Sequence, residues 1–358
     1  MSDWRCAHVY YYDDERRDEL ILDGIRPLLA RIGPAVPAAF FLRHWRQGPH
    51  VRVCVLSCDE EFHRIVEPAV SEVVEGYLRT HPSRSIVDEA SLLEAHERLA
   101  EREFERGPLR PLCPDNSIRY GPYDRRLHVL NSPQAADLLE DFYIDTNELV
   151  FDMLDRVRRG SNRLTIGLDL MLATAHAMWG DITRGFISYR AHAEGFIIQA
   201  SDPDRLRSVW EANFRKQSTA ITRRVHTVIA MLDGGQPPAP HVRTWVDALS
   251  PFQDRAGPLV RAGELRLTMG GEAGRANGWR QENLTHSDFQ QQLYGNRSYT
   301  DFMRNDPRFQ SYRLMLNLLY LHLHRLGIGA VERYYLCHLA ADAVEAAMDV
   351  SALALVSR

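Results

Sequence analysis

Four polar side chains fall on one face of an otherwise apolar helix predicted over residues 309–326. They occupy positions i, i+4, i+7 and i+11: Arg313, Asn317, Tyr320 and His324. Such a stripe either faces solvent or lines a cavity. The tyrosine at its centre favours a cavity, because a phenol both donates and accepts hydrogen bonds at neutral pH. The pattern therefore favours a cavity lined by Tyr320, with Asn317 and His324 as substrate-binding residues.

A second group of chemically capable residues, His286-Ser287-Asp288, lies in a polar segment that begins at Gln281. These residue types make up a hydrolase triad, but sequence neighbours rarely form one, because the members must converge from different elements. Ser287 is also a typical helix N-cap. We interpret Ser287 as a donor to a bound substrate, and Gln281 as a substrate-binding residue.

The segment 39–56 predicts a β-hairpin with an arginine in its second strand and a turn at Gly48-Pro49. In that strand valines alternate with three other residues: His50, Arg52 and Cys54. The valines therefore face a core, and the other three share the opposite face. Arg52 is a permanently charged fork that suits a carboxylate, an amide carbonyl or a developing oxyanion. The pattern alone favours an edge strand whose polar face lies in water.

A second hairpin or strand pair is predicted over 117–130, around Gly121-Pro122. It offers another cation and another phenol, Arg119 and Tyr120. We predict that both bind substrate, together with His50 of the first hairpin.

The elements that must position these residues predict an α+β fold. The N-terminal part combines a small sheet with helices on one face, from a strand over 7–12, a helix over 16–32 kinked at Pro27, the first hairpin and a helix over 60–80. The rest is mostly helical, with helices over 92–105, 134–158, 164–179, 182–198, 204–232, 242–249, 309–326 and 330–348. We predict a mostly helical single domain with a small antiparallel or mixed N-terminal sheet. Its halves are residues 1–130 and 131–358, with a polar linker near 233–241.

The composition of the 358 residues excludes some function classes. A net charge of −5 argues against a broad nucleic-acid-binding surface. Lys216 is the only lysine and lies in a polar run, so Schiff-base chemistry would depend on a solvated side chain. The chain has no HExxH, P-loop or Rossmann glycine motif, and the glycine-rich stretch 270–274 is typical of a loop. We therefore predict no metal and no cofactor.

The five cysteines form no close CxxC pair: Cys6, Cys54, Cys58, Cys113 and Cys337. Their odd number and the lack of a signal peptide predict a reduced, cytoplasmic protein. No apolar run approaches membrane-spanning length, so we expect no membrane contact.

The hairpin string FFLRHWRQGPHVRV, which begins at Phe40, resembles that of standalone thiopeptide-type proteins. These are related to the C-terminal elimination domain of class I lantibiotic dehydratases. Against that domain's HLRLRF-like run, Arg52 keeps the first arginine and Cys54 replaces the second. Its ERYGG-like segment is matched at 118–122, including Arg119. In its HMxxNRL-like segment, Tyr320 stands where the histidine of elimination would be.

Two further strings resemble the thiopeptide pyridine synthases: LNLLYLHLHRLGIGAVERYYLCHLAADAVE from Leu316, and HSDF from His286. These synthases look like elimination domains repurposed for a formal aza-(4+2) cycloaddition. The resemblance implies that two dehydroalanines of a leader-bearing thiazole peptide form a pyridine-centred macrocycle, with loss of water and of the leader peptide. It implies a cofactor-independent enzyme. The implied partners are the modified precursor peptide and other biosynthetic enzymes.

The implied reaction assigns roles to four residues. Tautomerisation and dehydration need a weak acid and a weak base, which Tyr320, Ser287 and His286 would supply. Arg52 would polarise the amide carbonyl.

Two alternatives stay open. A split glutamate-elimination lyase would make dehydroalanine from glutamylated serine; Arg52 and Arg119 favour it, whereas Cys54 and Tyr320 argue against it. A non-catalytic subunit would bind the leader peptide and present it to a partner dehydratase.

Overall fold

The computed structural model describes residues 3–130, 132–237, 239–265 and 287–357. The chain forms two compact units, residues 1–159 (unit 1) and residues 160–358 (unit 2). The predicted single domain, with halves 1–130 and 131–358, stays a prediction about domain organisation.

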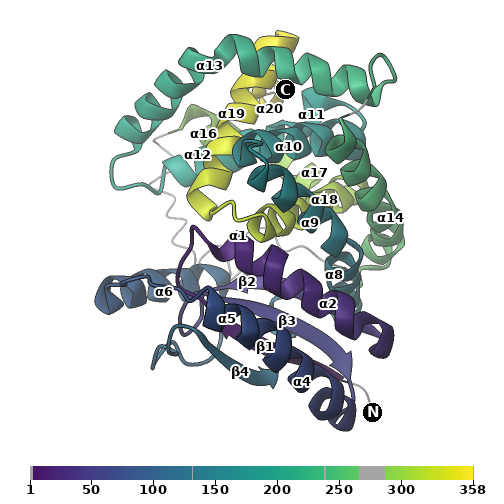
Figure 1. Cartoon of the computed structure of the whole chain (residues 1–358). Helices are drawn as coiled ribbons and strands as arrows, with labels where there is room; N and C mark the ends of the chain where they lie inside the picture. Colours follow the sequence, from purple (N-terminus) through teal and green to yellow (C-terminus); the bar gives the residue numbers. More distant parts are fainter. Residues whose placement is uncertain (1–2, 131, 238, 266–286, 358) are drawn as a thin grey trace. The chain divides into compact units, whose positions relative to one another are not determined.

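Unit 1 contains a four-stranded antiparallel sheet with the strand order β2-β3-β1-β4 (Figure 1). Its strands are β1 (Asp3–Tyr10), β2 (Ala38–His44), β3 (His50–Ser57) and β4 (Ser117–Pro122). Strands β2 and β3 form the first predicted hairpin. At its turn Gly48 has φ +117° and lies against Tyr12, so a side chain would not fit there.

Strand β3 lies between β2 and β1, so the predicted edge strand is wrong. Its polar face is buried, with exposed fractions of 1% for His50, 6% for Arg52 and 0% for Cys54. In the strand register His8 of β1 and Leu42 of β2 stand directly opposite Arg52. Alternation within one strand does not show which strands flank it, and therefore did not show this burial.

The prediction that all cysteines are reduced is also wrong for one pair. Cys6 and Cys54 form a disulfide between β1 and β3, with their Cα atoms 4.2 Å apart. They are 48 residues apart in sequence but stand directly opposite each other in the strand register. That register comes from the sheet, and the spacing of cysteines along the chain does not show it.

Two long helical segments in unit 1 contain π-helical turns. They comprise α1 (Arg17–Leu20), η1 (Ile21–Ile25) and α2 (Arg26–Ile32), then α3 (Asp59–Glu61), η3 (Phe62–Val66), α4 (Glu67–Val70), η4 (Ser71–Glu75) and α5 (Gly76–Thr80). Pro27 and Pro68 each come two residues after the end of a π-helical turn. Proline lacks an N–H and its ring needs space, so a wider preceding turn accommodates it. The helix predicted over 16–32 thus continues through Pro27.

The second predicted hairpin is wrong, because segment 117–130 contains the single strand β4 and then α7 (Leu127–Leu130). Strand β4 pairs with β1 as far as Pro122. Proline has no N–H to donate to a further ladder, and the strand ends there. The remaining helices of unit 1 are η2 (Gly33–Ala35), α6 (Glu89–Glu103), α8 (Pro133–Asp145) and α9 (Asn147–Arg158).

The described residues of unit 2 form helices only. These are α10 (Arg163–Trp179), α11 (Ile182–Gly185), α12 (Ile187–Ile197), α13 (Pro203–Leu232), α14 (Pro240–Ala262), α16 (Asp288–Gly295), α17 (Arg297–Asn305), α18 (Pro307–Arg325), α19 (Ala330–Met348) and α20 (Ala352–Val356). Helix α10 is central: it is buried from Ile166 to Ala175 and contacts α11, α13, α14, α18 and α19. Its buried Thr174 accepts a hydrogen bond from the indole of Trp245 in α14 at 2.9 Å.

Three predicted helices differ from the observed ones. Segment 134–158 is divided into α8 and α9, and segment 182–198 into α11 and α12. Segment 242–249 belongs to the longer α14, which continues through Pro251 and Pro258. The predicted linker near 233–241 follows α13, but its last two residues, Pro240 and His241, belong to α14. The predicted loop at 270–274 lies outside the described residues.

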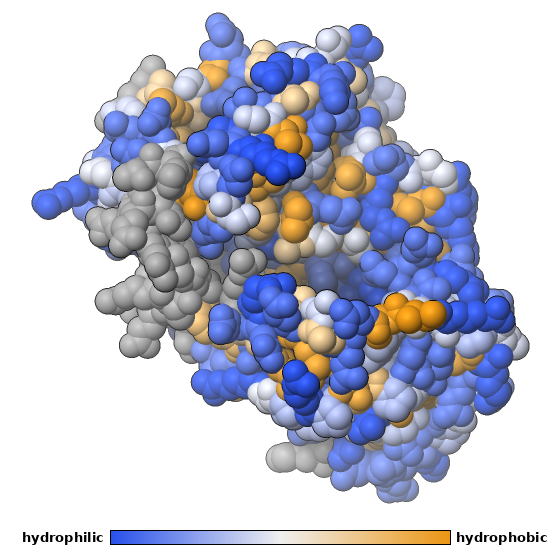
Figure 2. Space-filling view, turned by 90° about the vertical axis from the view of Figure 1, so that its left-hand side faces the viewer, coloured by the Kyte–Doolittle hydropathy of each residue, from blue (hydrophilic) through white to orange (hydrophobic). Residues whose placement is uncertain are grey.

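The predicted fold class is confirmed, since helices dominate and the small antiparallel sheet is N-terminal. In the described ranges, no helix is both long and apolar enough to span a membrane. On the face drawn in Figure 2, apolar side chains gather in small patches among hydrophilic ones.

The close approach of α11 to α10 gives a test of packing in unit 2. A Cβ atom at Gly185 would overlap the carbonyl oxygen of Ala175 and lie 3.0 Å from its carbonyl carbon. We expect Gly185→Ala to lower the free energy of unfolding by about 1–3 kcal/mol, measured by urea denaturation, because the backbone of α10 must move. Gly295→Ala is the matched control, because a Cβ atom there meets nothing within 4 Å. Equal stabilities of the two variants would contradict this account.

Candidate functional site

Tyr320 joins three helices of unit 2. Its hydroxyl lies 2.7 Å from Nδ1 of His192 in α12 and 3.5 Å from Sγ of Cys337 in α19. The side chain is half-buried on α18, and the His192 ring meets it edge-on. A phenol hydrogen-bonded to an imidazole is an acid–base pair, so Tyr320 has the kind of partner that its predicted role requires.

The surroundings keep the members of this group uncharged at neutral pH. Burial, and next the Arg333 and Arg313 guanidinium groups, lower the pKa of His192 to about 4. Burial, and next Cys337, raise the pKa of Tyr320 well above its usual value. Burial raises the pKa of the Cys337 thiol to about 12. We call Tyr320, His192 and Cys337 the Tyr320 group. It consists of a neutral phenol, a neutral imidazole and a thiol.

Cations lie close to this neutral group. The Arg333 guanidinium lies over the Tyr320 ring, 5.1 Å from its centre. Burial lowers the pKa of Arg313 to about 10, which leaves it charged at neutral pH. Cations near a phenol stabilise negative charge that develops on it or on an adjacent substrate oxygen.

The predicted polar stripe on α18 is not uniform. Asn317 and His324 are exposed, whereas Arg313 and Tyr320 are half-buried. The intervening His322 is fully buried, and its ring centre lies 4.7 Å from that of Trp245. Only part of the face therefore borders the Tyr320 group, and of these two neighbouring histidines His322 lies in the core and His324 on the surface.

Ser287 is a buried N-cap that links α16 to α12. Its Oγ accepts a hydrogen bond from the N–H of Gln290 at 3.2 Å and donates one to Glu194 Oε2 at 2.8 Å. Ser287 and Tyr320 both contact α12, but no hydrogen bond joins them among the described residues. His286 and Gln281 lie outside the described residues.

The other predicted residues belong to unit 1. The Nε atom of Arg52 donates to His50 Nε2 at 3.2 Å, and its guanidinium also lies 3.0 Å from Nδ1 of His44. Burial, and next Arg52, lower the pKa of His50 well below its usual value, so the ring is neutral and accepts. Arg119 and Tyr120 are exposed on β4. The described structure thus places four predicted residues in each unit.

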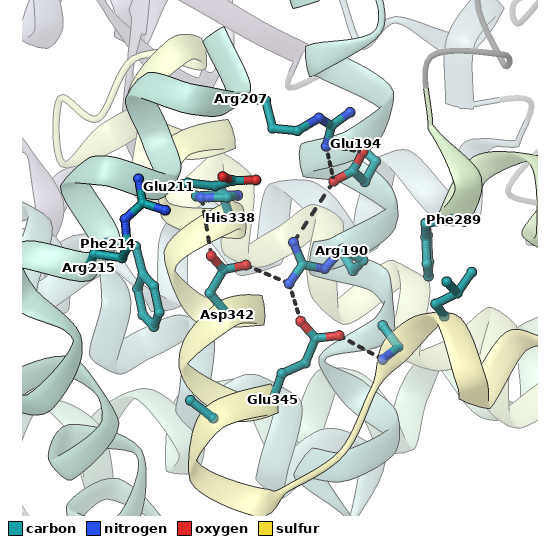
Figure 3. A pocket seen from close by; sticks show the side chains of 13 residues that line it. Arg190, Glu194, Arg207, Glu211, Phe214, Arg215, Phe289, His338, Asp342 and Glu345 are labelled. Carbon is teal, nitrogen blue, oxygen red and sulfur yellow. Dashed lines mark hydrogen bonds and ion pairs between the residues drawn. The ribbon is translucent and has the colours of Figure 1, made fainter. Parts of the chain in front are cut away.

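A charged pocket of about 520 Å³ opens in unit 2, and Glu194 forms part of its wall (Figure 3). We define it by its ionisable lining residues: Arg190, Glu194, Arg207, Glu211, Arg215, His338, Asp342 and Glu345. Arg190 is 9% exposed and contacts Asp342 at 2.5 Å, and also Glu345 and Glu194. Glu194 in turn binds Arg207 at 2.8 Å.

Sequence reasoning missed His192, Arg333 and the charged pocket. One signal was present, because His338, Asp342 and Glu345 fall at i, i+4 and i+7 of a predicted helix. No comparable signal marks His192, since its partner Tyr320 is 128 residues away. Among the described residues, no group of three His, Cys, Asp or Glu side chains is arranged to hold a metal ion.

The chain is similar to known proteins over most of its length. A family model described as "Lantibiotic biosynthesis dehydratase C-term" matches residues 4–344. Among solved structures, the pyridine synthase TbtD from thiomuracin biosynthesis is 36% identical, with a TM-score of 0.78 over 97% of this chain and 99% of that chain. No curated protein matches the sequence.

Two other solved structures share the fold alone. TsrL is 21% identical, with a TM-score of 0.75 over 100% of this chain and 98% of that chain. The tRNA-dependent lantibiotic dehydratase MibB from Microbispora sp. 107891 is 14% identical, with a TM-score of 0.51. That match covers 97% of this chain and 28% of MibB, so the chain corresponds to part of that dehydratase.

The neutral state of His192 predicts a dependence of stability on pH. The folded pKa of about 4 lies below the ordinary histidine value of 6.5, so between these values the unfolded chain binds a proton that the folded protein does not. The stability contributed by this group is present above pH 6.5 and is lost as the pH falls towards 4. We expect His192→Asn to reduce the slope of the unfolding free energy against pH near pH 5, measured by urea denaturation. The reduction should correspond to up to about one bound proton.

Tyr320→Phe is the matched control for that measurement. It removes the same hydrogen bond but keeps the half-buried imidazole, so we expect it to retain the pH dependence of the parent protein. An unchanged dependence in His192→Asn would show that His192 is not held neutral by burial.

Proposed function

The chain belongs to the lantibiotic biosynthesis dehydratase C-terminal family, and from this premise we propose that it is a pyridine-forming enzyme of thiopeptide biosynthesis. The observation that carries the proposal is the 36% identity to a pyridine synthase from thiomuracin biosynthesis over 97% of this chain. The Tyr320–His192 pair supports it, because it supplies weak acid–base chemistry in unit 2.

The proposed substrate is a leader-bearing, thiazole-containing peptide with two dehydroalanines. One dehydroalanine and the imidic-acid tautomer of a neighbouring amide form an azadiene, and the other is the dienophile. Ring closure makes two C–C bonds, because both ends of the azadiene C=C–N=C(OH) are carbon atoms. Loss of water and expulsion of the leader peptide as a carboxamide then give the pyridine. These reaction steps need proton transfers and a fixed orientation of the two dehydroalanines, and they involve no net oxidation.

The Tyr320–His192 pair suits both directions of proton transfer. When the imidazole proton is on Nε2, the phenol donates to Nδ1 and its oxygen accepts from a substrate N–H or O–H. When the proton is on Nδ1, the imidazole donates to the phenol oxygen, and the phenol O–H is directed to the substrate as an acid. One pair thus serves tautomerisation and loss of water, and Arg333 stabilises the charge that develops.

The other predicted residues take supporting roles in this proposal. Ser287 and His286 precede α16, and we propose that Ser287 fixes the start of that helix on Glu194. In unit 1, His50 and His44 are bonded to Arg52, so we propose that Arg52 orders the hairpin instead of polarising the substrate.

The proposal also covers the residues that contact the peptide, the partners of the enzyme and its location. The exposed Asn317, His324, Arg119 and Tyr120 are proposed contacts of the peptide, as is Gln281. The proposed partners are the modified precursor peptide and the other enzymes that modify it. We propose that the enzyme acts in the cytoplasm and needs no cofactor.

The proposal is tested with two synthetic peptides and mass spectrometry. One carries thiazoles and preformed dehydroalanines behind its leader, and the other carries glutamylated serines. We expect the first to lose water and to release the leader as an amide. Loss of glutamate from the second with the first unchanged would establish the elimination lyase instead. Binding of both without change would favour the leader-presenting subunit.

The role of Tyr320 gives a sharper prediction. Tyr320→Phe keeps the ring but removes the hydroxyl that bonds His192, so we expect pyridine formation to slow by roughly 100-fold or more. Leader affinity, measured by fluorescence anisotropy, is expected to stay within about twofold. The control is Tyr299→Phe in α17, a half-buried tyrosine outside the Tyr320 group, which should keep the parent rate. Equal rates of Tyr320→Phe and the parent would remove Tyr320 from the chemistry.

A further inference from the structure

We propose that the charged pocket of unit 2 is a binding site for a cationic side chain of a bound peptide, a guanidinium or a primary ammonium. The site is separate from the Tyr320 group and goes beyond the proposed pyridine formation. Three observations support it within the described residues. Arg190 and Arg207 are already paired with carboxylates, a buried imidazole lacks a hydrogen bond of full geometry, and one carboxylate lacks a partner.

The arginines of the pocket wall are already used by its carboxylates. Arg190 contacts Asp342, Glu345 and Glu194, and it is 9% exposed. Arg207 donates to both carboxylate oxygens of Glu194 at 2.8 Å. These guanidinium groups are therefore poor anchors for an anionic ligand, because such a ligand would have to displace buried carboxylates.

Carboxylates outnumber cations around the pocket. Its lining contains four acidic residues and three arginines. The fourth acid, Glu211 on α13, is half-buried and has no hydrogen bond or ion pair within the described part of the chain. Arg215, one turn further along α13, is exposed at the rim. The interior of the pocket therefore carries an excess of negative charge that a cation would neutralise.

His338 supplies a buried imidazole in the pocket wall. It is 2% exposed and lines the cavity from α19, and Figure 3 shows it between Asp342 and Glu211. Its Nε2 atom lies 3.3 Å from Asp342 Oδ2 and the backbone of Trp210 also acts on the ring, yet neither ring nitrogen makes a hydrogen bond of full geometry among the described residues. Buried polar atoms are normally paired, so an unpaired imidazole in an open pocket points to a ligand.

The chemistry of these groups selects a cationic N–H donor. Burial, and next Arg190, lower the pKa of His338 to about 4, so its neutral ring offers an acceptor nitrogen. The second oxygen of Asp342 and the carboxylate of Glu211 add anionic acceptors. A guanidinium presents several N–H groups in one plane and can bond more than one of these acceptors at once.

The aromatic part of the wall fits the same class of ligand. Phe214 of α13 and Phe289 of α16 line the pocket together with the methyl groups of Ala346 and Leu353. The methylene stem of an arginine or lysine packs on such surfaces while its charged end reaches polar groups. A small inorganic cation would leave these apolar residues without a contact.

The test uses the full chain and blocked amino-acid amides. N-acetyl-arginine amide is titrated into the protein, and the imidazole ¹⁵N signals of His338 are followed by NMR. Isothermal calorimetry on the same titration gives the dissociation constant without any assignment. N-acetyl-citrulline amide has the same shape without the charge, and N-acetyl-glutamate amide has the opposite charge. Glycine amide separates a chain-terminal ammonium from a side-chain cation.

We expect saturable binding of the arginine amide that shifts the His338 signals, with weaker binding of the other three amides. Glu211→Gln should weaken it by about tenfold or more, because a charged partner is replaced by a neutral one of the same shape. Asp247→Asn, an exposed carboxylate on α14, is the matched control and should bind like the parent. Glu211 is half-buried and without an ion pair in the described residues, so its variant should fold.

Three results would overturn the proposal. They are binding of the citrulline or glutamate amide as tight as that of the arginine amide, equal affinities in Glu211→Gln and the parent, and the absence of binding by every probe. These results would leave the pyridine-forming activity untouched, since that activity is measured by peptide mass and depends on Tyr320.

Discussion

The need to pair buried polar groups on one helix organises unit 2. Helix α12 carries Arg190, His192 and Glu194, and an unpaired buried polar group costs about 1–3 kcal/mol or more if charged. Arg190 is paired by α19, His192 by α18, and Glu194 by α13 and α16. Four helices are thereby held against α12 at defined points. Apolar packing on α10 supplies the core, but these polar contacts determine which helix faces which.

The same constraint defines the chemistry that unit 2 can support. Burial without a compensating anion keeps His192 neutral and Tyr320 protonated, with Arg333 beside them. Such a group is a weak acid and a weak base at neutral pH, which suits proton transfer to amides and hydroxyls. It is a poor source of a strong nucleophile, because the neighbouring Cys337 thiol is held protonated by burial.

Unit 1 shows where the residues of the resembling hairpin lie. Cys54, which by that resemblance stands at the position of a second arginine, forms a disulfide with Cys6. Arg52 is buried beside His50 of its own strand and His44 of β2. A guanidinium bonded in this way orders a sheet more readily than it binds a substrate, because leaving its partners would expose them unpaired. The retained arginine alone is therefore weak evidence for the elimination reaction.

The sequence by itself determined the fold class, the first hairpin, the long helices of unit 2 and the choice of Tyr320 as the centre of a polar face. Those features depend on local periodicity and on residue type, which are properties of neighbouring residues. Family strings such as FFLRHWRQGPHVRV extended this to a proposed function, because elimination domains and pyridine synthases are expected to differ at particular residues such as Cys54 and Tyr320. Ser287 was recognised as a possible N-cap for the same local reason.

Only the tertiary structure decided which strands flank β3, which cysteines face each other and which residue partners Tyr320. Each of these pairs is distant in sequence, by 48 residues for Cys6 and Cys54 and by 128 for His192 and Tyr320. No periodic pattern within one segment encodes a partner on another, because strand register and helix packing are set by the whole core. The neutral state of His192 and the open acceptors of the charged pocket follow from burial, and burial exists only once the helices have packed.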